Sequence, residues 1–116
     1  MIKEKRHGQV VVISLKGNFL GEPETSKLRE KVYKLLEENR KHVVIDFGGV
    51  DVINSMGIGT LVASLVSVRQ KGGDVCLARL NDKIEAVIAI MHLVKVFRIY
   101  ETVNHAVKSF DVFFPK

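Results

Sequence analysis

An apolar run at residues 43–47 is the feature that most constrains how this chain can fold. The run reads Val43-Val44-Ile45-Asp46-Phe47. A strand that is apolar at consecutive positions is typical of a parallel sheet, in which helices cover both faces. Beyond a short loop, apolar residues recur at helical spacing from Ser55 onward. A buried strand followed this closely by a helix predicts an α/β fold.

The alternation of strands and helices extends along most of the chain. Strands that are separated by single helices predict a mostly parallel central sheet with right-handed crossovers. A tight turn at His7-Gly8 predicts an antiparallel hairpin at the N-terminal edge of that sheet. We therefore expect one domain spanning residues 1–116, with about four helices. The predicted strands cover residues 2–6, 9–15, 42–47, 74–80 and 96–99, and the predicted helices begin near Pro23, Ser55, Asn81 and Val103.

Residues with special backbone preferences mark the helix ends. Pro23 suits the first turn of a helix, Asn39 suits a left-handed stop, and Gly72-Gly73 ends the next helix. Asn81 is predicted to cap the third helix. In the helix that begins near Ser55, one side is predicted to be buried and the other exposed. The predicted buried stripe is Ile58, Leu61, Val62, Leu65 and Val66, and the predicted exposed side carries Thr60 and Ser64.

Composition narrows the classes of protein that need to be considered. The 116 residues include 18 Lys and Arg against 13 Asp and Glu, a net charge of +5. Because this excess is spread along the chain without interleaved aromatic residues, we expect no direct nucleic-acid contact, and attraction to an acidic protein partner is the better interpretation. No apolar stretch is long enough to insert into a membrane, and no signal region is visible. We therefore expect a soluble cytoplasmic protein.

Residues suited to catalysis or metal binding are sparse. Cys76 lies within an apolar run and is predicted to be buried and inert. Gly48-Gly49 lacks the remainder of a phosphate-binding loop. The histidines lie far apart without the spacing of metal ligands, at His7, His42, His92 and His105. We expect no intrinsic catalysis, no metal and no cofactor.

A lone serine lies where the helix after the central strand begins. The segment reads Asn54-Ser55-Met56-Gly57-Ile58-Gly59. It resembles the signature of the sulfate transporter and anti-sigma factor antagonist (STAS) domains, whose usual form is an Asp-Ser-x-Gly-Leu-Gly run at the start of a helix. The order of elements resembles that fold over nearly the whole chain. Two positions that are usually acidic in the family carry Leu20 and Asn54 here.

The resemblance implies an anti-sigma factor antagonist, which is a protein–protein switch controlled by phosphorylation. Its expected partner is an anti-sigma factor with serine kinase activity that binds the ATP itself. The unphosphorylated chain would bind this partner and free a sigma factor, and Ser55 would be the phosphoacceptor. The expected partner-binding residues are Leu20, Asn54, Met56, Gly57, Thr60 and Ser64, and Asp46 and Gly59 are expected to be structural at the site.

Simpler interpretations of the same residues remain open at the level of the sequence. The Ser55 hydroxyl can merely cap the helix, which contributes about 1 kcal/mol. Gly57 and Gly59 can allow close packing of the helix onto the sheet, or leave bare backbone for a partner. Asp46 can accept hydrogen bonds from loop N–H groups. The alternative function is a non-phosphorylated STAS scaffold, or a ligand-sensing subunit of a transport or signalling assembly. The oligomeric state and the partner's identity are open.

Overall fold

The computed structural model describes residues 2–115 and confirms the predicted order of the elements. The β5 strand begins two residues later than predicted, because turns occupy the segment before it. The strands are β1 (Ile2–His7), β2 (Val10–Lys16), β3 (His42–Gly49), β4 (Asp74–Ala78) and β5 (Arg98–Tyr100). The helices are α1 (Glu24–Glu37), α2 (Ser55–Gln70), α3 (Asp82–Ile90) and α4 (Val103–Phe113).

The strands of residues 2–115 form one five-stranded sheet in the order β1-β2-β3-β4-β5. β1 and β2 are antiparallel, and every other neighbouring pair is parallel. Gly8 makes the turn between β1 and β2 at a φ of +62°, a conformation that glycine adopts without strain. The predicted mostly parallel sheet with an antiparallel N-terminal edge is thus confirmed.

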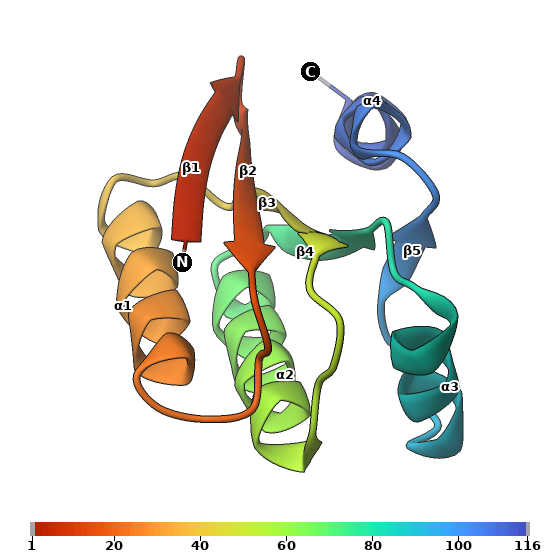
Figure 1. The fold of residues 1–116 in the computed structure, drawn as a ribbon. Coiled ribbons are helices and arrows are strands. Elements are labelled where there is room, and N and C mark those ends of the chain that lie inside the picture. Colours follow the sequence, from red (N-terminus) through yellow and green to blue (C-terminus); the bar gives the residue numbers. More distant parts are fainter. Residues whose placement is uncertain (1, 116) are drawn as a thin grey trace.

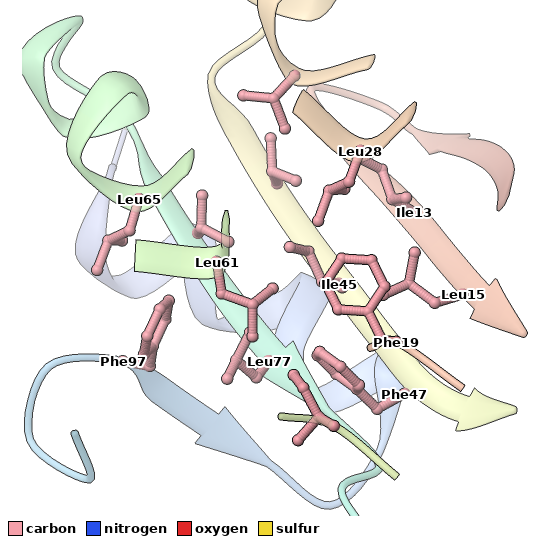
Figure 2. Packing of buried hydrophobic residues seen from close by; sticks show 14 of the residues in the cluster. Ile13, Leu15, Phe19, Leu28, Ile45, Phe47, Leu61, Leu65, Leu77 and Phe97 are labelled. Carbon is pink, nitrogen blue, oxygen red and sulfur yellow. The ribbon is translucent and has the colours of Figure 1, made fainter. Parts of the chain in front are cut away.

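The larger part of the hydrophobic core lies between the sheet and helices α1, α2 and α3. Ile13, Ile45 and Leu77 of the strands point toward this side, where Leu28 and Leu61 of the helices meet them (Figure 2). Helix α4 lies on the opposite side of the sheet from α1 and α2 (Figure 1). Helices therefore pack against both faces of the sheet.

The central strand β3 is apolar at consecutive positions because its side chains are buried on both faces of the sheet. Val43 and Ile45 belong to the core under α1 and α2, whereas Val44 belongs to the smaller cluster under α4. Cys76 of β4 lies in that smaller cluster, and burial raises the pKa of its thiol to about 11. The thiol is therefore protonated at neutral pH, as expected for an inert buried cysteine.

The predicted helix ends are also confirmed. Asn39 adopts a left-handed φ of +59° just after α1, and Gly72 adopts +84° after α2. The Asn81 Oδ1 accepts a hydrogen bond from the Ile84 N–H at 2.8 Å and caps α3. None of the helices in residues 2–115 has the length and apolar character that crossing a membrane requires.

Candidate functional site

Ser55 is the first residue of α2, and its side chain is exposed. The residue before it, Asn54, is extended, and its Oδ1 accepts a hydrogen bond from the Gly57 N–H at 3.0 Å. The interpretation of Ser55 as the helix cap is therefore wrong, because Asn54 fills that role. The hydroxyl of Ser55 is left at the positive end of the helix, facing solvent.

Asn54 also joins α2 to the loop that follows β2. Its Nδ2 donates to the Leu20 carbonyl oxygen at 2.7 Å. Beside this bond, Phe19 forms an isolated parallel bridge with Ile53, and the Phe19 N–H donates to the Val52 carbonyl at 3.0 Å. Two loops far apart in the sequence thus form one continuous surface around Ser55.

Gly57 is buried under this loop. A Cβ at Gly57 would overlap the Phe19 carbonyl oxygen, and would lie 2.8 Å from the Phe19 ring and 2.7 Å from Ile53 Cγ1. The structure therefore supports the close-packing interpretation of Gly57, since its bare backbone is already in contact with Phe19, and a partner contact at Gly57 stays a prediction. Gly59 is exposed, and a Cβ there would meet no atom within 4 Å, so close packing does not explain it.

Two apolar side chains remain exposed beside Ser55. Leu20 is 42% exposed and Met56 is 56% exposed. The Met56 sulfur lies 3.2 Å from the position a Cβ on Gly21 would take, so Met56 lies against the loop that carries Leu20. Leu20, Ser55 and Met56 are called the α2 face below. Leucine and methionine side chains left in solvent on one face are suited to burial by another protein.

Thr60 and Ser64 do not belong to the α2 face. They are 4% and 3% exposed, so the expectation that they lie on the exposed side of α2 is wrong. The Thr60 hydroxyl donates to the Met56 carbonyl at 3.1 Å, which satisfies it within the helix. The exposed side carries Val66 instead. The buried side of α2 is thus rotated from the predicted stripe toward its small polar residues.

Asp46 lies on the other face of the sheet from α2. Side chains alternate along β3, and Ile45 and Phe47 face α2 while Val44 faces α4, so Asp46 shares the side of Val44. Asp46 accepts the Gly48 N–H at 2.9 Å, as a loop-capping carboxylate would. Its main partner, Arg79, was not foreseen from the sequence. The interpretation that Asp46 accepts hydrogen bonds from loop N–H groups is therefore confirmed by the Gly48 N–H, while its carboxylate lies across the sheet from α2.

The charge distribution at the start of α2 differs from that of the neighbouring loop. The first turn of α2 contains no acidic residue. Glu22, the nearest acid in the loop after Leu20, accepts hydrogen bonds from Thr25, from the Ser26 hydroxyl and from the Ser26 N–H. The hydrogen bond from the Ser26 hydroxyl is the main reason that the pKa of Glu22 is below its usual value. The carboxylate of Glu22 thus caps the first turn of α1 and does not compensate the positive end of α2.

Comparison with known proteins points to one family. A family model described as the STAS domain matches residues 1–106. A candidate anti-sigma factor antagonist of Thermotoga neapolitana is 28% identical over 76 residues, which cover 66% of this chain and 67% of that protein. The anti-sigma F factor antagonist of Paenibacillus polymyxa is 20% identical over 112 residues, which cover 96% of this chain and 95% of that protein.

Solved structures are similar in fold. A candidate anti-sigma factor antagonist of Thermotoga maritima has a TM-score of 0.86 at 22% identity, covering 93% of this chain and 92% of that one. The Bacillus cell fate determinant SpoIIAA in its phosphorylated form has a TM-score of 0.75 at 15% identity, covering 94% and 98%. At these identities the similarity concerns the fold.

Proposed function

The chain belongs to the STAS domain family, and from this premise we propose that it is an anti-sigma factor antagonist controlled by phosphorylation of Ser55. In its unmodified form it binds an anti-sigma factor in the cytoplasm and thereby frees a sigma factor. The kinase and its ATP belong to the anti-sigma factor, so the chain itself is a substrate and not an enzyme. Residues 1–116 act as one STAS unit.

One observation carries the proposal: the exposed Ser55 is the first residue of α2, next to the exposed Met56 and near the loop that carries the exposed Leu20. An exposed hydroxyl is accessible to a kinase. The apolar neighbours, Leu20 and Met56, give a partner something to bury. The serine and the exposed apolar side chains thus lie on one face, which supports a contact controlled by phosphorylation.

A phosphoryl group on Ser55 would change this face in two ways. It adds nearly two negative charges, which a docked partner would have to desolvate or repel. At the same time it lies at the positive end of α2, where a negative charge is stabilised. Phosphorylation should therefore release the partner without unfolding the helix.

Leu20 and Asn54 are uncharged at positions that are usually acidic in the family, and this favours an apolar contact with the partner. Because Leu20 and Met56 are already about half buried, they contribute roughly 0.7–1.5 kcal/mol each if a partner buries the remainder. Salt screens exposed charges beyond about 10 Å but hardly changes such burial. Affinity for the partner should therefore fall only modestly between low and physiological salt, and Leu20→Asp should weaken it clearly.

The proposal is tested with purified chain, each kinase-type anti-sigma factor of the source organism, and ATP. Mass spectrometry follows phosphate transfer, and titration calorimetry follows binding. Ser55→Ala should keep its affinity and gain no phosphate, whereas Ser55→Asp should bind more weakly because of its charge. Ser67→Ala is the matched control, since Ser67 is half-buried on the same helix, and it should behave as the unmodified chain.

Two outcomes would contradict the proposal. If Ser55→Ala and Ser55→Asp both bind as the unmodified chain does, the switch is absent and the scaffold function is favoured. If binding depends steeply on salt, or Leu20→Asp binds more tightly, charge rather than apolar burial governs the contact.

A further inference from the structure

A polar row crosses the sheet on the face that carries α4. Lys3 of β1 pairs with Ser14 of β2, and Ser14 pairs with Asp46 of β3. Helix α4 packs against Val10 and Val12 at the beginning of β2. The end of β2, where Ser14 lies, instead lines an open pocket. This part of the sheet is therefore not covered by any helix of residues 2–115.

Arg79 folds back from the end of β4 over this row. Its Nε and Nη2 donate to the two oxygens of Asp46 at 2.8 and 2.9 Å. Two features of the backbone make room for this contact. Arg79 itself adopts a left-handed φ of +59°, and any side chain at Gly48 would collide with the guanidinium. Such local strain in a non-glycine residue is found preferentially at functional sites.

The ion pair leaves part of Arg79 available. The Arg79 side chain is 51% exposed, whereas Asp46 is buried beneath it. The Arg79 Nη1 donates to no acceptor in the part of the chain that the structure describes. Burial alone would raise the pKa of Asp46, but the hydrogen bonds from Arg79 and the Gly48 N–H outweigh it and lower the pKa. Asp46 is therefore ionised and neutralises Arg79 at neutral pH.

The pocket beside this pair has a volume of about 210 Å³. That volume is smaller than the roughly 300–1,000 Å³ of pockets for drug-sized ligands, so it suits a small ion or a small ester. Even without Lys16, the cationic side chains of Lys3 and Arg79 outnumber the one carboxylate, that of Asp46, so the lining has an excess of positive charge. The lining residues are Lys3, Ser14, Leu15, Lys16, Asp46, Gly49 and Arg79.

We propose that this pocket binds the phosphate group of a small molecule, with Lys3 and the free edge of Arg79 as donors. Guanidinium and ammonium groups are the usual ligands of phosphate in proteins. The position agrees with the tendency of α/β sheets to bind ligands at the carboxyl ends of parallel strands. The site lies on the other face of the sheet from Ser55, and the inference is independent of the proposed function.

The experiment is a titration of the purified chain with inorganic phosphate, followed by amide chemical shifts in two-dimensional NMR. Ionic strength is held constant with sodium chloride. A second arm uses glycerol phosphate, a small phosphate ester, and a third uses acetate. We expect saturable shifts at Ser14, Gly49 and Arg79 with both phosphate compounds, and none with acetate.

A matched pair of variants separates a site from diffuse charge. Lys3 and Lys5 both lie on β1 and face the same side of the sheet, but only Lys3 lines the pocket. Lys3→Gln should weaken phosphate binding about two- to fivefold, as loss of one exposed charge pair does. Lys5→Gln should leave the dissociation constant unchanged. Both lysines are exposed, so neither variant should impair folding.

Three results would overturn the inference. Shifts that rise without saturation would show that phosphate acts only as a general counterion. Equal weakening by Lys3→Gln and Lys5→Gln, or equal binding of acetate, would show that the pocket does not recognise phosphate. Shifts centred on residues 55–57 would place the anion at the start of α2.

Discussion

The starts of α2 and α3 are built in the same way but differ in charge. Each helix is preceded by an extended asparagine whose Oδ1 accepts the N–H three residues on, at 3.0 Å for Asn54 and 2.8 Å for Asn81. Each asparagine also donates its Nδ2 to a loop carbonyl, that of Leu20 at 2.7 Å and that of Asp51 at 2.9 Å. A carboxylate could make the first of these bonds but could not donate the second.

The difference lies in the first turn. Helix α3 carries Asp82 and Glu85 there, whereas α2 carries no acid. Negative side chains at a helix start compensate its positive end. Helix α3 therefore provides its own compensation, and α2 leaves the place for negative charge open at Ser55. A phosphate on Ser55 would give the first turn of α2 negative charge, as Asp82 and Glu85 already give the first turn of α3.

Among the substitutions that test this comparison, we expect the largest change in the free energy of unfolding at the third residue of α2. Gly57 in α2 corresponds to Ile84 in α3, because Phe19 occupies the space that a side chain at Gly57 would need. Gly57→Ala should lower the free energy of unfolding by about 1–3 kcal/mol through overpacking. Urea denaturation measures this change.

Gly59→Ala is the matched control for Gly57→Ala. It lies in the same helix with open space around it, and should raise the free energy of unfolding by up to about 1 kcal/mol. Equal effects of the two substitutions would mean that helix propensity, and not contact with Phe19, governs the start of α2.

The two asparagines give the next largest effect. Asn54→Ala and Asn81→Ala should each lower the free energy of unfolding by about 1–2 kcal/mol, because a cap and a loop bond are lost together. Asn54→Asp should cost less than Asn54→Ala, since the carboxylate keeps the cap. Asn81→Asp should cost more than Asn54→Asp, because its charge would join Asp82 and Glu85. Thermal and urea denaturation of the four variants would refute the comparison if the two aspartates cost the same.

The smallest expected effect tests the charge difference itself. Ser55→Asp should raise the free energy of unfolding by about 0.3–1 kcal/mol at low salt, and Asp82→Asn should lower it by a similar amount. Both changes should shrink as salt is added, because the interaction is screened. If Ser55→Asp destabilises the chain at low salt, α2 does not have an open place for negative charge.

Much of the fold could be predicted because local signals and long-range packing agree. Asn39, Gly72 and Asn81 act at helix ends in the structure as their backbone and side-chain preferences predict. The apolar run of β3 predicted a strand buried on both faces, and it is one. The motif at the start of α2 likewise indicated the STAS family, and the match of the family model to residues 1–106 confirms it.

The prediction of which side of α2 is buried was wrong because the two sides of this helix have similar hydrophobicity. Apolar side chains surround most of α2, so periodicity alone could not decide whether Val66 or Ser64 is buried. Packing decides it, and it buries the smaller residues. The partner of Asp46 lies 33 residues along the chain, and the only local signal for Arg79 is its position directly after β4. Contacts of this kind depend on sheet register, which the sequence does not state.

Phosphate on Ser55 in the native cell is the most direct test of the proposed switch. The chain would be recovered from its native cells under several growth conditions and fragmented by mass spectrometry. We expect phosphate on Ser55 in a fraction of the molecules, and its loss when the gene of the partner kinase is deleted. Phosphate on another residue, or none on Ser55 while that kinase is active, would contradict the proposal.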